Sequence, residues 1–285
     1  MSTLALRRAE PAALPFVEGA LNYLAPTEGR PFTLTYEPDP GQPRTNIVNE
    51  THRMPMHDLR PVANSLSLDA EGFALVNAPS AVSNFYDEDE LRRVYYPEAE
   101  RIVASATGGA RVFVFDHTVR RRVWGSEDRA PGAPRQPVGR VHVDHTDRSG
   151  PQRVRDFFGA EADALLKGRV QIINLWRPIR GPLRDAPLAV CDASTVAPDD
   201  LVLTDLVYRD RKGEIFSVRH AAAHRWYYAP GMQPDEALLL KCYDSETAPG
   251  IARFMPHTAF EDPTAPADIL PRESIELRTM VFHAA

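Results

Sequence analysis

Two histidines and one aspartate in this chain have the types and spacing of a metal-binding set. His142 and Asp144 flank a single valine in a segment that alternates like a β-strand, and His257 follows much later in the chain. Residues two apart in a strand point to the same face, so this imidazole and this carboxylate are expected to lie side by side. Two imidazoles and one carboxylate form the facial ligand set of mononuclear non-haem Fe(II) sites, which leaves coordination positions open.

An arginine and a serine beyond His257 form a second candidate site. Arg272 and Ser274 are expected on one face at the start of a last strand over residues 274–282. A guanidinium and a hydroxyl on one strand face can clamp a carboxylate, and the planar fork of arginine matches it bidentately. Arg278 continues this face, either as a second anion contact or as a partner of Glu276. The alternative is an ordinary charged face exposed to solvent.

The order His-x-Asp, then His, then Arg-x-Ser resembles that of the Fe(II)/2-oxoglutarate-dependent oxygenases. Three other histidines compete as ligands. His145 points away from His142 if the strand continues, which makes it a poor partner. His220 and His224 are the competing distal ligands. His224 begins a strand and suits substrate lining or core packing, and His257 alone stands at the appropriate distance from Arg272 and Ser274. We therefore predict His142, Asp144 and His257 as metal ligands and catalytic residues.

Several side chains are expected near a substrate or co-substrate. In a buried strand over 170–176, Asn174 and Trp176 share one face and Arg177 opposes them. We predict Asn174, with Arg272, Ser274 and Arg278, as a cofactor-binding residue. Packing in the core is the alternative for the aromatic residues. The substrate-lining candidates are Trp176, Arg177, Trp226, Tyr228 and His224.

The composition is that of an ordinary globular protein. The 285 residues are 43% hydrophobic and 25% charged, and the net charge of -6 argues against a nucleic-acid partner. The short basic cluster Arg120–Arg122 is interpreted as a solvated strand end. No apolar run is long enough to cross a membrane, and the first residues lack a signal sequence. The predicted location is cytoplasmic, the predicted partner is a small-molecule substrate, and the oligomeric state stays open.

The pattern of elements favours a mainly β fold with flanking helices. Short strands recur between turns along most of the chain, as in a sandwich or barrel. The 26 prolines also suit turns better than helices. Helices are expected from residue 87 to about 107, with a break or kink at Pro97, and from 154 to 166. Residues 1–63 are predicted to be an N-terminal extension packed on a core domain over 64–285.

Longer motifs carry a family resemblance. From about Gly72 to Phe282 the chain resembles the family that contains the cephamycin 7α-methoxylation component, fungal gibberellin desaturase and aspergillic-acid-type hydroxylase/desaturases. That resemblance implies a double-stranded β-helix (jelly-roll, cupin-like) fold and the use of Fe(II), 2-oxoglutarate and O2. It implies hydroxylation, desaturation or cyclisation of a small molecule of specialised metabolism, with release of succinate and CO2. The motifs lie at residues 174–179, 187–192, 226–232, 235–245, 256–260 and 272–278.

Two other functions keep the same scaffold. A cupin-like metalloenzyme that uses O2 without 2-oxoglutarate would retain the three metal ligands but form no succinate, and it would tolerate loss of Arg272. A non-catalytic jelly-roll binding protein would bind neither Fe(II) nor 2-oxoglutarate. The Arg-x-Ser motif after the second histidine favours the 2-oxoglutarate-dependent enzyme over both.

Overall fold

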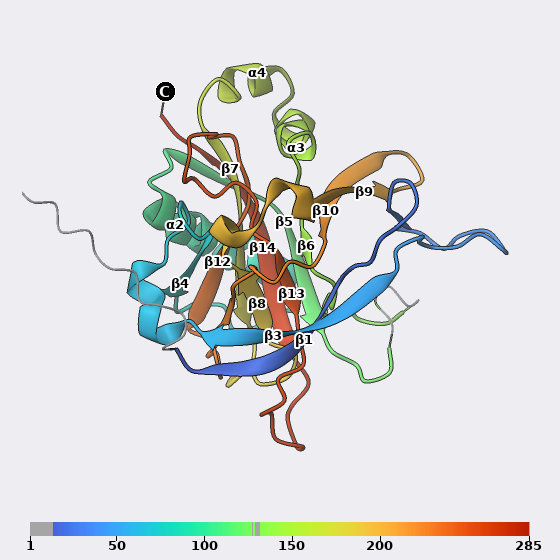
Figure 1. Cartoon of the computed structure of the whole chain (residues 1–285). Helices are drawn as coiled ribbons and strands as arrows, with labels where there is room; N and C mark the ends of the chain where they lie inside the picture. The colour runs from blue at the N-terminus through green and yellow to red at the C-terminus, as the bar shows by residue number, and fades with distance from the viewer. Residues whose placement is uncertain (1–13, 127, 129–131, 285) are drawn as a thin grey trace, which may run out of the picture.

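Two β-sheets face each other across the main hydrophobic core (Figure 1). The computed structural model describes residues 14–126, 128 and 132–284, so residues 1–13 of the expected N-terminal extension lie outside it. The five-stranded sheet has the order β4 (Phe73–Asn77), β12 (Glu236–Asp244), β7 (Val170–Pro178), β14 (Glu273–Phe282) and β5 (Arg111–Arg121).

The nine-stranded sheet carries the two histidine-bearing strands in the middle of its order. It runs β1 (Phe16–Leu24), β3 (Asn49–Asp58), β11 (Trp226–Tyr228), β8 (Leu188–Cys191), β13 (His257–Ala259), β6 (His142–Val143), β10 (Lys212–Val218), β9 (Leu201–Val207) and β2 (Phe32–Leu34). Because β13 pairs directly with β6, side chains far apart in sequence meet on one face of this sheet.

The alternation along β14 divides its side chains between two environments. Ile275 and Leu277 pack towards the helices in a second core. Ser274, Glu276 and Arg278 alternate with them, so they point between the two sheets. They are not on a solvent face, because the exposed fractions of Ser274 and Glu276 are 1% and 6%. The sequence-based division of this strand into two faces is therefore confirmed.

A short helical layer covers the outer face of the five-stranded sheet. Asp87 caps α1 (Glu88–Glu90) by accepting a hydrogen bond from the Glu90 N–H at 3.0 Å. A π-helical turn, η3 (Leu91–Tyr95), leads into α2 (Tyr96–Thr107), which ends at Gly108 with φ of 69°. Pro97 lies in the first turn of α2, where proline is tolerated. The expected interruption therefore precedes Pro97, as the π-helical turn.

The remaining helical segments are short. The second expected helix appears as α3 (Ser149–Phe158), η4 (Gly159–Glu161) and α4 (Ala162–Leu165). The connections also contain η2 (Arg60–Ser65), η5 (Ala193–Thr195) and η6 (Pro198–Asp200). Within the described ranges, no helix is long and apolar enough to span a membrane.

The N-terminal strands curl the nine-stranded sheet onto itself. The strand β1 forms a parallel bridge from Asn22 to Arg140, just before β6, and the Val141 N–H donates to the Asn22 carbonyl at 2.9 Å. A third core, with Tyr23 and Trp226 among its members, packs on this curled part. Residues 14–63 thus contribute strands to the sheet that carries both histidines (Figure 1).

A buried ionic cluster holds the end of β12. The Lys241 Nζ lies 2.7 Å from Asp244 Oδ2 and 2.7 Å from Asp69 Oδ1, and both the Lys241 and Asp244 side chains are 0% exposed. Arg169 also donates to Asp244, at 2.6 Å. Burial alone would raise the pKa of Asp244, but the Arg169 hydrogen bond and the Lys241 charge outweigh burial and hold the pKa below 3.8.

We expect Asp244→Asn to lower the free energy of unfolding by about 3 kcal/mol, because it leaves a buried ammonium with less compensation. Urea denaturation at pH 7 measures this loss, with the exposed Asp210→Asn as the control. The folded-state pKa of Asp244 is depressed, so its stabilisation is complete above 3.8 and is lost as the pH falls through the folded pKa. The free energies of unfolding of the wild type and Asp244→Asn should therefore become equal as the pH is lowered. A difference that stays constant down to low pH would contradict the role of the ionised Asp244.

Candidate metal centre

His142, Asp144 and His257 converge between the two sheets. One donor atom from each residue lies within 4.8 Å of the other two, and no other group of three such residues does so in the described part of the chain. The Nε2 atoms of His142 and His257 lie 3.3 and 4.0 Å from Asp144 Oδ1. The pairing of His257 with His142 in the β13–β6 ladder places both rings on one face.

Backbone carbonyls orient both imidazole rings. His142 Nδ1 lies 2.8 Å from the Arg140 carbonyl, and His257 Nδ1 lies 3.3 Å from the Met255 carbonyl. A ring that donates from Nδ1 leaves the lone pair of Nε2 available for a metal. Burial, together with the neighbouring His142, lowers the pKa of His257 to about 4, so this ring is neutral at pH 7.

Two residues of the five-stranded sheet contact Asp144 through its Oδ2 atom. Asn174 Nδ2 donates to Asp144 Oδ2 at 2.8 Å, and Arg278 Nε lies 3.5 Å from the same oxygen. Asn174 also donates to Glu276 at 2.8 Å, and Glu276 accepts from Arg278 at 2.9 Å. Burial by itself would raise the pKa of Asp144, but the His142 hydrogen bond and the Arg278 charge hold it well below its usual range. The carboxylate is therefore ionised, with Oδ1 towards the histidines.

These features fit a divalent metal of the iron type. Two imidazoles and one ionised carboxylate supply nitrogen and oxygen donors, and each donor is fixed by a hydrogen bond on its far side. The competing histidines lie elsewhere. His145 bonds Ser149 Oγ at 3.4 Å, His224 bonds Asp200 at 3.0 Å, and the ring centroid of His220 lies 3.6 Å from that of His52.

Arg272 and Ser274 lie beside this centre. The Arg272 Nε donates to Ser274 Oγ at 3.0 Å and its Nη1 donates to the Ala186 carbonyl at 2.7 Å. Its guanidinium carbon lies 4.8 Å from the centroid of the Trp176 ring. Arg272 and Trp176 line a cavity of about 20 Å³ together with His142 and His257, and Arg120 and Glu276 also line it. Arg278, by contrast, lies beside Asp144, as Asn174 does.

Sequence reasoning missed Arg120 in this cavity. The interpretation of Arg120–Arg122 as a solvated strand end is wrong for Arg120, of which only 9% is exposed. It pairs with Ser274 across the β5–β14 ladder, so both side chains point between the sheets. Alternation along the strand places residue 120 on the same face as residue 118. The sequence does not show that this face is buried, because the partner strand β14 is distant in the chain.

The candidate substrate-lining residues are spread over several environments. Trp176 lines the small cavity. Arg177 is fully buried on the opposite face of β7, with its guanidinium carbon 4.9 Å from the Tyr95 ring centroid. The other three belong to the surroundings of the third core. The Trp226 Nε1 donates to the Tyr23 hydroxyl at 2.7 Å, Tyr228 packs edge-on against Phe260, and His224 stacks on Tyr23.

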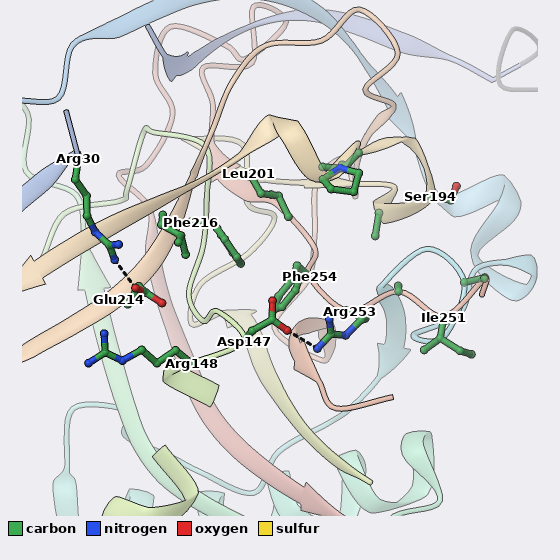
Figure 2. A pocket seen from close by; sticks show the side chains of 17 residues that line it. Arg30, Asp147, Arg148, Ser194, Leu201, Glu214, Phe216, Ile251, Arg253 and Phe254 are labelled. Carbon is green, nitrogen blue, oxygen red and sulfur yellow. Dashed lines mark hydrogen bonds and ion pairs between the residues drawn. The ribbon is translucent and has the colours of Figure 1, made fainter. Parts of the chain in front are cut away.

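A second, much larger pocket is lined in part by residues that lie close in the chain to the metal ligands, such as Asp147 and Phe254. Its volume is about 980 Å³, and it contains none of the three candidate ligands. Figure 2 shows its mixed lining: Phe216 and Phe254 provide an aromatic side, and Asp147 is paired with Arg253 at 2.6 Å. Phe216 pairs with Val143, the residue between His142 and Asp144, in the β10–β6 ladder. A pocket of this size suits a small organic molecule.

Comparison with known proteins gives matches over nearly the whole chain. The family described as an oxidoreductase/YMDC permease-like domain matches residues 21–282. The chain is 31% identical over 274 residues to the Fe(II)/2-oxoglutarate-dependent dioxygenase nvfI of Aspergillus novofumigatus, covering 93% of this chain and 96% of that protein. It is 34% identical over 260 residues to the hydroxylase/desaturase efuI of Hormonema carpetanum, covering 84% and 86%.

The similarity extends to three-dimensional structure. The solved structure of the iron and alpha-ketoglutarate-dependent endoperoxidase NvfI matches with a TM-score of 0.84 at 30% identity, covering 95% of this chain and 99% of that one. The expected double-stranded β-helix, or jelly roll, is thereby confirmed. The family match over residues 21–282 includes the three converging residues and the Arg-x-Ser motif.

Proposed function

Because the chain belongs to the Fe(II)/2-oxoglutarate-dependent dioxygenases, we propose that His142, Asp144 and His257 hold its Fe(II) and that it oxidises a small molecule of specialised metabolism. The observation that carries this proposal is the convergence of three oriented donors within 4.8 Å. When bound, Fe(II) and 2-oxoglutarate supply oxidation of the substrate by O2, with release of succinate and CO2.

The chain's own residues then have separate tasks. The carbonyls of Arg140 and Met255 keep the two Nε2 lone pairs directed at one point. Asn174 and Arg278 occupy Asp144 Oδ2, which leaves Oδ1 for the metal. We assign these two residues to the orientation of Asp144 and not to direct contact with 2-oxoglutarate.

Arg272 and Ser274 are proposed to hold the C5 carboxylate of 2-oxoglutarate. Arg272 is buried, and Nε binds the hydroxyl of Ser274, so both groups are already positioned. The cavity of about 20 Å³ is too small for this dicarboxylate, however, because it has room for about one water. We infer that Trp176, whose ring lies over Arg272, shifts when 2-oxoglutarate enters.

The large pocket, whose lining includes residues close in the chain to the metal ligands, is the proposed substrate site. Asp147 follows Asp144 closely in the chain, and Phe254 just precedes Met255 and His257, so the lining continues from the segments that carry the ligands. Its aromatic side and paired charges suit an amphipathic molecule. Hydroxylation, desaturation and cyclisation are the proposed reaction types. A cytoplasmic location and the lack of nucleic-acid or membrane partners stay predictions.

We expect His142→Ala, His257→Ala and Asp144→Ala each to abolish Fe(II) binding, because each removes one of only three protein donors. Anaerobic titration calorimetry with Fe(II) measures the affinity directly and needs no substrate. His145→Asn is the matched control, since it replaces the histidine adjacent to Asp144 that lies outside the cluster. Normal Fe(II) affinity in His257→Ala would show that the assigned ligand set is incorrect.

Anaerobic addition of 2-oxoglutarate to the Fe(II)-loaded protein should produce a visible metal-to-ligand charge-transfer band. Arg272→Ala should lose this band at the same 2-oxoglutarate concentration while Fe(II) affinity is kept, because the anchor for the C5 carboxylate is removed. Bound Fe(II) without any band in the wild-type protein would contradict the use of 2-oxoglutarate and favour an O2-using enzyme without it.

Entry of 2-oxoglutarate should also change tryptophan fluorescence, because the Trp176 ring leaves the buried guanidinium of Arg272. The change is measured anaerobically with Mn(II) in place of Fe(II). Trp176→Phe should abolish the change, whereas Trp124→Phe, at an exposed position, should retain it. An equal change in Trp176→Phe would mean that the cavity widens in another way.

A further inference from the structure

Two arginines, one on β5 and one just before β14, face the cavity beside the proposed iron site. Arg120 on β5 pairs with Ser274 on β14, and paired residues of antiparallel strands share a face. Arg272 precedes Ser274 by two residues and therefore points the same way. Both arginines line the cavity with His142 and His257, and their exposed fractions are 9% and 3%.

Neither guanidinium makes a hydrogen bond to a carboxylate among the described residues. Arg120 Nη1 donates to the Gln136 carbonyl at 2.7 Å, and Arg272 donates to the Ala186 carbonyl and the Ser274 hydroxyl. Asp128 Oδ1 is 3.9 Å from Arg120 Nη1, but it accepts from Arg135 Nε at 2.8 Å.

The carboxylate that lines the same cavity is also engaged. Glu276 accepts hydrogen bonds from Asn174 and Arg278, on the side of Asp144. Burial, and then the charge of Arg120, lower the pKa of the Arg272 guanidinium, so the two cations destabilise each other. Buried charges are normally paired. A site with two such cations facing one cavity is therefore suited to an anion that enters from outside.

We propose that Arg120 is a second cationic anchor for 2-oxoglutarate, so that Arg120 and Arg272 together hold its C5 carboxylate. This inference rests on the proposed function of Arg272 and Ser274. A carboxylate has two oxygens with about four lone-pair positions, which is enough for two guanidinium groups and one hydroxyl.

The paired anchor also determines which 2-oxo acid is accepted. A dicarboxylic 2-oxo acid brings the distal charge that compensates the two cations. A monocarboxylic one, such as 2-oxobutyrate, buries the cations further without compensation, and unpaired buried polar groups discriminate strongly between ligands. Arg120 is thus a specificity-determining residue for the co-substrate, and it has no part in holding the metal.

The test is the dissociation constant of 2-oxoglutarate for Mn(II)-loaded protein, measured anaerobically by calorimetry. Arg120→Gln should raise it by about 10- to 100-fold, the range for one hydrogen bond to a charged group. Arg120→Lys should raise it less, because the charge is kept. The control is Arg121→Gln, which changes the next residue of β5, on its exposed opposite face, and should leave the constant unchanged. Mn(II) affinity should be the same in all four proteins, which also reports correct folding.

Selectivity provides the second readout. The ratio of the 2-oxobutyrate and 2-oxoglutarate dissociation constants should fall in Arg120→Gln, since one of the two buried cations that face the cavity is gone. If Arg272→Gln loses 2-oxoglutarate but Arg120→Gln binds it like the wild type, the inference about Arg120 is overturned and the proposed function stands. If the wild-type protein binds Mn(II) but no 2-oxoglutarate, the proposed function itself fails, and this inference with it.

Discussion

An ionised carboxylate between two apolar sheets is the constraint on which the rest of the site depends. Without partners, burial would raise the pKa of Asp144 and favour the protonated carboxyl, which is a poor metal ligand. Asn174 and Arg278 contact Oδ2 of Asp144 and offset the cost of burying its charge. Oδ1 stays directed at the histidines. Glu276 in turn compensates Arg278, so the charges form one connected network. Such a network is stable only when each member keeps its partner.

The two sheets contribute different parts of the site. The nine-stranded sheet carries both histidines on paired strands, so their separation is determined by one ladder. The five-stranded sheet carries the groups that orient Asp144 and the two arginines beside the cavity. The relation between metal ligands and anchor therefore depends on how the sheets pack. The core between them, which includes Trp176 and Met255, is part of what positions the chemistry.

Local periodicity predicted which side chains of the last strand share a face, and this part of the site followed from the sequence. The alternation of β14 assigned Ser274, Glu276 and Arg278 to one face, and the structure buries that face between the sheets. Arg120 could not be placed in this way, because a basic run at a strand end looks the same whether its partner strand is present or absent. The sequence could not decide between substrate lining and core packing for Trp226, because its hydrogen-bond partner Tyr23 lies on a strand about 200 residues away.

The curled N-terminal strands have a consequence for the order in which this protein can fold. The stretch before β6 is held by Asn22, 117 residues from Gly139 in the chain, and β6 itself is flanked by β13 and β10. Nearly every neighbour of β6 is thus distant in sequence. In such topologies the loop-closure entropy is lost before the contacts form. The ligand cluster is expected to assemble among the last native features, so iron would be loaded onto a chain that is already folded instead of nucleating its folding.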